Sequence, residues 1–279
     1  MSISTMLVPV GTSDPREQKI LRYVCGLAVQ SVRRVLIATV VDDSGLEAPV
    51  VAAEMDRARE RLAEWTAALT AECAMDIETR VVTGDRSGAI LALALQADVD
   101  VICCATEGKS VVDALFSGSV SEDLFASGKI RTMTVRNSIL DAVEDPAELS
   151  RGFAKRLVVP TDFSASATRA WLSAIERPAE VIGQLYALHI ITSGDEQERR
   201  NAEVLLKGLL SIASEHGLEA TSEIRTGDPA DAVLAFLNEV KATGVITGMH
   251  GRSVLARTIL GGTSLKLLRE APCPVVVQP

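Results

Sequence analysis

Thr83-Gly84-Asp85 is a short stretch that occurs twice in this chain, the second time as Thr226-Gly227-Asp228. Two further glycines follow each copy at matching distances, as Gly108 and Gly118 after the first and as Gly251 and Gly261 after the second. The offset is 143 residues throughout. It predicts two copies of one domain, because a solenoid repeats every 20 to 50 residues or so. The repeated residues are turn-formers at the ends of apolar runs, where α/β sheets place ligand sites.

Length and composition agree with two ordinary domains. The chain has 279 residues, of which 47% are hydrophobic and only 3% aromatic, so each half can bury an aliphatic core. Aliphatic strands are typical of parallel sheets that helices cover on both faces. We expect domain 1 over residues 1–137 and domain 2 over residues 154–279. Residues 138–153 show little periodicity and are interpreted as a linker.

Charge and targeting patterns exclude several classes of partner. The net charge of −9 argues against a nucleic-acid surface, which needs clustered Lys and Arg. A nucleotide is not excluded, because backbone N–H groups can hold a phosphate on an acidic protein. The sequence shows no signal-peptide layout and no run of 18 apolar residues, so we expect a cytoplasmic protein without a membrane partner.

The five cysteines form no CxxC pair and no metal-ligand spacing. Two of them lie in the apolar run 101–104, which is typical of a buried strand. The sequence therefore predicts small core residues in a reducing compartment, at Cys25, Cys73, Cys103, Cys104 and Cys273.

Apolar runs alternate with amphipathic segments along both halves. In the first half we expect strands at 6–10, 35–41, 77–82, 99–104 and 132–135, with helices over about 15–31, 50–73, 87–97 and 119–127. In the second half we expect strands at 156–160, 184–191, 221–225, 244–247 and 274–277, with helices near 165–176, 195–215, 229–241 and 263–270. The alternation predicts doubly wound, Rossmann-like parallel sheets with helices on both faces.

The segment with the most specific chemistry begins with Gly248-Met249-His250-Gly251 and ends with Gly261-Gly262-Thr263-Ser264. It follows a predicted strand and leads into a predicted helix. Glycines there let the backbone approach a phosphate, and a helix N-terminus offers unpaired N–H donors. Thr263 and Ser264 can add hydroxyl donors. The alternative is a glycine turn followed by an ordinary Ser/Thr helix cap.

A carboxylate, Asp162, follows the first predicted strand of the second half, in the stretch Val158-Val159-Pro160-Thr161-Asp162. In a doubly wound sheet the loops after strands one and four meet at a crevice. A carboxylate there can accept a hydrogen bond from a ribose hydroxyl or an exocyclic amine. The alternative is that Asp162 only caps the helix that starts near Ser164. The nearby glycine loop favours the binding interpretation.

Several of these stretches together resemble the universal stress protein (UspA) family. They are Val-Pro-Thr-Asp-Phe-Ser at 159–164, Leu-His-Ile-Ile at 188–191, Thr-Gly-Asp-Pro at 226–229 and the glycine loop, whose form in nucleotide-binding members is G-x2-G-x9-G-(S/T). The resemblance covers nearly the whole chain. It implies two tandem UspA-type domains packed as a pseudo-dimer through their last strands, here 132–135 and 275–277.

The resemblance also implies a site for an adenine nucleotide, ATP or AMP with or without Mg²⁺, in the second half. Asp162, next to Thr161, would contact the adenine, either Ile190 or Ile191 would flank it, and Gly227 would lie by the ribose. The phosphates would be held by the glycine loop and the start of the helix after it, at Gly248, Gly251, Gly261 and Gly262. Thr263 and Ser264 can add hydroxyl donors there. His250 and Arg252 lie in the loop and either contact the ligand or face the solvent.

Both halves depart from the family pattern. Gly262 stands where the family has Ser or Thr, so a hydroxyl comes only one residue later, at Thr263. In the first half Gly11 replaces the Asp, and Ala105 replaces the first glycine, where a Cβ would crowd a phosphate. The rest of that pattern is present, as Gly84, Gly108, Lys109, Gly118 and Ser119. We expect a degenerate site in domain 1 and a better-preserved one in domain 2.

The sequence shows no catalytic set, because its three histidines are far apart and no Ser-His-Asp order stands out. His189 is interpreted as a satisfied core residue. Three interpretations remain. The first is a nucleotide-binding stress sensor or regulatory module, which can also self-associate as a dimer of chains. The second is a scaffold that binds no nucleotide and acts through protein partners, which the departures in both halves favour. The third is a slow ATPase, for which no S-G-G-x-D-S phosphate loop is present.

Overall fold

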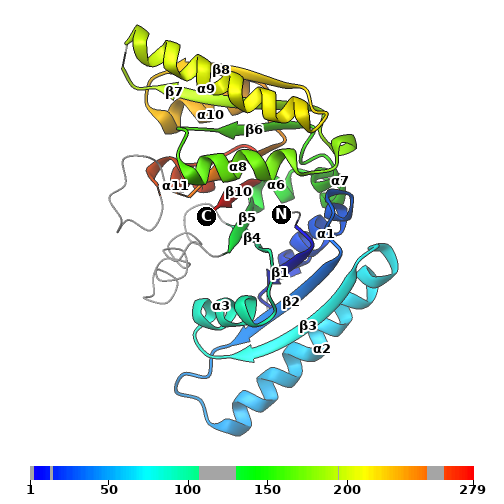
Figure 1. Ribbon diagram of the computed structural model, residues 1–279. Coiled ribbons are helices and arrows are strands. Elements are labelled where there is room, and N and C mark those ends of the chain that lie inside the picture. The colour runs from blue at the N-terminus through cyan, green and yellow to red at the C-terminus, as the bar shows by residue number, and fades with distance from the viewer. Residues whose placement is uncertain (1–2, 13–14, 107–129, 194, 250–260) are drawn as a thin grey trace.

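The computed structural model describes residues 3–12, 15–106, 130–193, 195–249 and 261–279. Within these ranges all strands join one ten-stranded sheet, in the order β3-β2-β1-β4-β5-β10-β9-β6-β7-β8. The strands are β1 (Thr5–Pro9), β2 (Arg34–Val41), β3 (Asp76–Thr83), β4 (Val101–Thr106), β5 (Arg131–Arg136), β6 (Arg156–Pro160), β7 (Gln184–Ile191), β8 (Ala220–Thr226), β9 (Gly244–Gly248) and β10 (Val275–Gln278). Figure 1 shows the second half above the central β5 and β10, and most of the first half below them.

Helices connect these strands on both faces of the sheet (Figure 1). The α-helices of the described ranges are α1 (Gln18–Gly26), α2 (Ala48–Glu72), α3 (Arg86–Gln96), α6 (Asn137–Asp141), α7 (Pro146–Arg151), α8 (Ala165–Ile175), α9 (Glu196–Glu215), α10 (Pro229–Glu239) and α11 (Gly262–Glu270). Short 3-10 helices occur at Pro15–Glu17, Leu27–Gln30 and Ala179–Val181. The helix predicted at 119–127 lies outside the described residues.

Each half is a doubly wound parallel sheet, as predicted. The first strand of each half lies between the second and the fourth: Met6 pairs with both Val35 and Val101. In the second half Leu157 pairs with both Leu185 and Gly244. This order opens a crevice at the carboxyl ends of the first and fourth strands.

The two halves meet through their last strands. β5 and β10 pair in antiparallel orientation, with Met133 opposite Val276, so the predicted pairing of these strands is confirmed. Helices α1, α2, α8 and α9 contribute to a single apolar core, which includes Leu62 of the first half and Trp171 of the second. The opposite face has one cluster in each half, around Leu91 and around Phe236. The tandem halves therefore fit a pseudo-dimer with one shared core.

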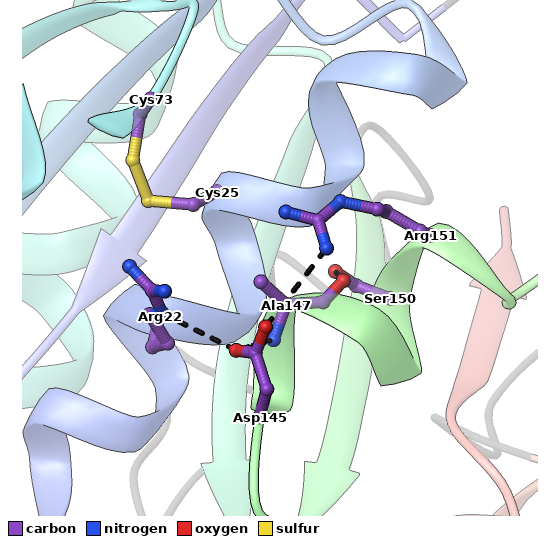
Figure 2. A network of polar contacts seen from close by, with 7 residues as sticks. All are labelled: Arg22, Cys25, Cys73, Asp145, Ala147, Ser150 and Arg151. Carbon is purple, nitrogen blue, oxygen red and sulfur yellow. Dashed lines mark hydrogen bonds and ion pairs between the residues drawn. A yellow bond between two sulfur atoms is a disulfide. The ribbon is translucent and has the colours of Figure 1, made fainter.

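The segment 138–153, interpreted from the sequence as a linker, is largely helical, because α6 and α7 occupy most of it. The Asp145 side chain accepts the Ala147 N–H at 3.0 Å and caps α7, whose first residue is proline. That hydrogen bond and the nearby Arg22 guanidinium hold the pKa of Asp145 below its ordinary value. Asp145 also pairs with Arg22 of α1 at 3.2 Å (Figure 2). The linker is therefore docked on the first helix of domain 1.

Two of the five cysteines are not reduced core residues, so that part of the cysteine prediction is wrong. Cys25 and Cys73 form a disulfide with a Cα–Cα distance of 5.1 Å. The packing of α1 against the end of α2 brings them together across 48 residues, a proximity that cysteine spacing alone does not reveal. The other three, Cys103, Cys104 and Cys273, are buried free thiols, as expected of core residues.

No helix in the described ranges combines the length and the apolar character needed to cross a bilayer.

Candidate functional site

A cavity of about 690 Å³ opens at the carboxyl ends of β6, β7 and β9. It is lined by the loop after β6, the end of β7, the first turns of α9, the end of β9 and the start of α11. We call it the half-two pocket. Of the predicted site residues, it is lined by Thr161, Asp162, Ile190, Gly248, Gly261, Gly262, Thr263 and Ser264. The topology thus brings together residues that lie about a hundred positions apart in the chain.

Asp162 holds the turn that leads from β6 into α8. Its Oδ1 accepts the Ser164 N–H at 3.0 Å. The cap of α8 is Ser164 instead, whose hydroxyl accepts the Ala167 N–H at 3.3 Å. The alternative role of Asp162 as the helix cap is therefore wrong, and its carboxylate lines the half-two pocket.

Two aromatic rings line the same pocket as this carboxylate. Phe163 has a φ of 61°, and its ring centroid is 4.6 Å from that of His189. His189 Nδ1 is 2.7 Å from the Thr161 carbonyl oxygen, so this nitrogen carries the hydrogen and donates it. The side chain of His189 is buried and satisfied, as predicted, but both rings also line the pocket, which the sequence did not indicate.

The start of α11 forms the opposite part of the pocket. Gly261 is the N-cap and uses its own N–H to bond the Met249 carbonyl at 2.9 Å. The next N–H groups, of Gly262, Thr263 and Ser264, have no intrahelical acceptor because they belong to the first turn. The positive end of the helix dipole is therefore directed to a cavity large enough for a ligand.

Ser264 is hydrogen-bonded to Gly248, and Gly248 packs closely against α8. The Ser264 hydroxyl donates to the Gly248 carbonyl at 2.6 Å and is buried. A Cβ on Gly248 would lie 2.6 Å from Ser166 Oγ and 2.7 Å from the Ala167 nitrogen. Glycine is thus required at 248 by the close packing of α8, a reason different from the predicted approach of a phosphate. At Gly262, by contrast, a Cβ would have nothing within 4 Å.

The remaining predicted residues of this site fall into two groups. Ile191 is 3% exposed and Gly227, with a φ of 141°, forms the turn before α10; neither lines the pocket. Of the two candidates Ile190 and Ile191, it is Ile190 whose side chain lines the pocket. Residues His250, Gly251 and Arg252 lie outside the described ranges.

The sequence reasoning missed the first turns of α9. Asp195, Gln197, Glu198 and Asn201 line the half-two pocket. Asp195 caps the helix by accepting the Gln197 N–H at 2.8 Å, and Glu198 accepts the Ser193 hydroxyl at 2.5 Å. The sequence signal for this part of the pocket is Asp195, which stands at a helix start after β7. The loop after the second strand of a doubly wound half also borders the crevice. Its acids make this part of the pocket negative, opposite the positive start of α11.

Only part of the equivalent region of domain 1, at the carboxyl ends of β2 and β3, has a cavity, of about 440 Å³. Asp42, Asp43, Asp85 and Arg86 line it, and no residue of β1 or β4 does. Hydrogen bonds from Ser44 hold the pKa of Asp42 below its ordinary value, so this carboxylate stays charged at neutral pH. Gly84 has a φ of 119° in the turn beside it, and Ala105 is the fifth residue of β4. The other predicted residues of this site, Gly108, Lys109, Gly118 and Ser119, lie outside the described ranges.

Among the described residues, no group of three or more His, Cys, Asp and Glu side chains is arranged to hold a metal ion.

Comparison with known proteins gives consistent matches. The sequence model described as the Universal stress protein family matches residues 2–136 and again residues 154–279. Universal stress protein MJ0531 of Methanocaldococcus jannaschii is 26% identical over an alignment of 137 residues, gaps included, that covers 44% of this chain and 81% of that protein. Stress response protein NhaX of Bacillus subtilis is 28% identical over 80 residues, 29% of this chain and 48% of that protein. A solved universal stress protein structure from Archaeoglobus fulgidus shares the fold, with a TM-score of 0.76 and 24% identity over 98% of this chain and 95% of that one.

Proposed function

Because this chain belongs to the universal stress protein family, we propose that it binds an adenine nucleotide, ATP or AMP, in the half-two pocket and acts as a sensor or regulatory module in the stress response. The observation that carries the proposal is that one cavity is lined both by the Asp162 carboxylate and by the first turn of α11. Its volume of about 690 Å³ lies in the range usual for small-molecule sites. We further propose a cytoplasmic location.

The charges of the pocket support one orientation of the nucleotide. Phosphates fit the start of α11, where first-turn N–H groups and the helix dipole favour an anion. The acids of α9 and Asp162 would repel phosphates and instead accept hydrogen bonds from the ribose hydroxyls and the adenine amino group. Ile190 supplies an apolar surface for the base. Mg²⁺ would enter only with the phosphates of ATP, as part of the ligand.

A scaffold without nucleotide is the second candidate. It is favoured by Gly262, which offers no hydroxyl at the first position of α11, and by the three carboxylates at the cavity of domain 1. In that case the tandem halves act through protein partners. A slow ATPase ranks last, because the sequence has no S-G-G-x-D-S phosphate loop after the first strand of either half.

Calorimetric titration of the nucleotide-stripped protein with ATP–Mg²⁺ tests the proposal. We expect one site per chain, and we expect Asp162→Ala to weaken binding at least tenfold, about 1.4 kcal/mol, because the adenine amino group loses its acceptor. Asp162→Asn should weaken binding similarly. It retains one acceptor oxygen for the Ser164 N–H but replaces the other by a donor.

The matched control is Asp43→Ala, which removes an exposed carboxylate beside the cavity of domain 1. Its affinity and stoichiometry should equal those of the wild type. Absence of heat and of any thermal shift at millimolar ATP would reject the nucleotide proposal and leave the scaffold. Binding lost in Asp43→Ala but retained in Asp162→Ala would place the site in the other half.

Gly262→Ser is expected to tighten ATP binding about fivefold, about 1 kcal/mol, because it adds a hydroxyl donor at the first position of α11. The new side chain has room, since a Cβ there has nothing within 4 Å. Gly208→Ser is the matched control, because Gly208 is an exposed helical glycine of α9 with equal room that does not line the pocket. Equal affinities for both variants would show that phosphates do not lie at α11.

A further inference from the structure

The disulfide between Cys25 and Cys73 connects two helices of domain 1. Cys25 belongs to the last turn of α1, and Cys73 directly follows α2. Figure 2 shows Cys25 on the same helix as Arg22, whose side chain pairs with Asp145 of the linker. The next residue, Gly26, packs so closely on α7 that a Cβ there would lie 2.1 Å from the Ala147 carbonyl oxygen. The disulfide therefore links α2 through α1 to the linker.

The other three cysteines differ from this pair in their surroundings. Cys103, Cys104 and Cys273 are buried, and burial raises the pKa of the Cys104 and Cys273 thiols to about 12. Burial also raises the pKa of Cys103 well above its ordinary value. Thiol–disulfide exchange requires the thiolate, so these three thiols are inert near neutral pH. Cys25 is only half-buried, whereas Cys73 is 7% exposed.

A groove of about 300 Å³ lies between α1, α2 and the linker, one helical turn from each cysteine, although neither Cys25 nor Cys73 lines it. Leu21 and Arg22 of α1 line it, one helical turn before Cys25. Trp65 and Leu69 of α2 line it as well, and Leu69 lies one turn before Cys73. The groove is large enough to hold part of a small thiol or disulfide next to the two helices that carry the pair.

We propose that Cys25 and Cys73 form a reversible thiol–disulfide exchange site whose co-reactant is a low-molecular-weight disulfide for oxidation and the corresponding thiol for reduction. In oxidation the Cys25 thiolate attacks one sulfur of the disulfide RSSR, whose S–S bond breaks and releases one RS⁻. The Cys73 thiolate then attacks Sγ of Cys25 and releases the second RS⁻. The two protons of the cysteines go to the released thiolates, so two protein thiols and RSSR give one protein disulfide and two RSH.

The structural consequence concerns the edge of the sheet. Cys73 precedes β3, which is the outermost strand of domain 1. Reduction releases the end of α2 and the start of β3 from α1, while Arg22 and Gly26 keep α1 on the linker. We expect the oxidised chain to melt about 5–10 °C higher than the reduced chain, as for a disulfide that closes a loop of this length.

The test uses the full chain equilibrated with mixtures of glutathione and glutathione disulfide, trapped by alkylation and analysed by mass spectrometry. We expect Cys25 and Cys73 to change together, in one transition, in the native protein. A melting-temperature difference between the oxidised and reduced forms should appear in the wild type and in Cys104→Ala, the matched control. It should be absent in Cys25→Ser and in Cys73→Ser.

The order of attack gives a second readout that needs no stability measurement. In Cys73→Ser, glutathione disulfide should leave a stable mixed disulfide on Cys25, whereas Cys25→Ser should react at least tenfold more slowly at Cys73. The proposal is overturned if the native pair stays reduced at every glutathione ratio, or if it is reduced only after denaturation. It is also overturned if both single variants react at equal rates.

Discussion

Gly248→Ala is expected to lower the free energy of unfolding by about 3 kcal/mol, because it overpacks a contact between backbones. The added Cβ would lie 2.7 Å from the Ala167 nitrogen and 2.8 Å from the Ser166 carbonyl carbon, neither of which can rotate away. Either α8 shifts away from β9 or the strand bends. Urea unfolding followed by tryptophan fluorescence measures the loss, since Trp171 is buried in α8 itself.

Gly262→Ala is the matched control, because Gly262 lines the same pocket but has open space around its Cβ position. Its unfolding free energy should stay within about 0.5 kcal/mol of the wild type. The result distinguishes two reasons for glycine at 248. A Gly248→Ala protein of normal stability that no longer binds nucleotide would contradict the packing explanation and support a direct approach of the phosphate.

Trp171→Ala is expected to cost about 3–5 kcal/mol of unfolding free energy. The side chain is fully buried in the shared core, and its indole Nε1 donates to the Leu209 carbonyl of α9 at 3.1 Å. The substitution leaves a large cavity between α8 and α9 and removes a second donor from the Leu209 carbonyl, which keeps its intrahelical partner. The first turns of these two helices border the half-two pocket. Urea unfolding followed by circular dichroism measures it, because the variant loses a fluorophore.

Trp171→Phe separates packing from hydrogen bonding. It keeps most of the apolar volume and loses the indole donor, so a loss of about 1–2 kcal/mol is expected. If the alanine variant cost no more than the phenylalanine variant, the core between α8 and α9 would be able to collapse around the missing ring. That outcome would contradict the tight packing of the two helices.

The positions of strands and helices along the chain could be predicted because each element carries its own periodicity. β1 alternates between two covered faces, with Met6 in one core cluster and Leu7 in another, so its residues are apolar in succession. Such runs identify a buried strand but not the direction of each side chain. For this reason the sequence could not choose between Ile190 and Ile191, and only the pleat of β7 directs Ile190 to the pocket.

Other features depend on contacts between distant segments, which a single sequence does not encode visibly. The disulfide of Cys25 and Cys73 needs the packing of α1 on α2, and the glycine at 248 needs the approach of α8. The helix α7 had local signals, Asp145 followed by Pro146, but its short length and charged composition suggested a linker. The acids of α9 have only a local signal in the sequence, the N-cap Asp195 after β7, and their place in the pocket depends on how the strands order in the sheet.

The antiparallel pair of β5 and β10 joins the two halves of one sheet within a single polypeptide. In an assembly of two identical chains, dilution separates the subunits, and every substitution appears on both sides. Here the covalent connection fixes the local concentration of one half around the other, so their union is independent of protein concentration. Each half can also diverge alone, as Asp162 and Gly11 already have at equivalent positions. The two halves can then take different roles, so that one half keeps the ligand-binding residues and the other only completes the sheet.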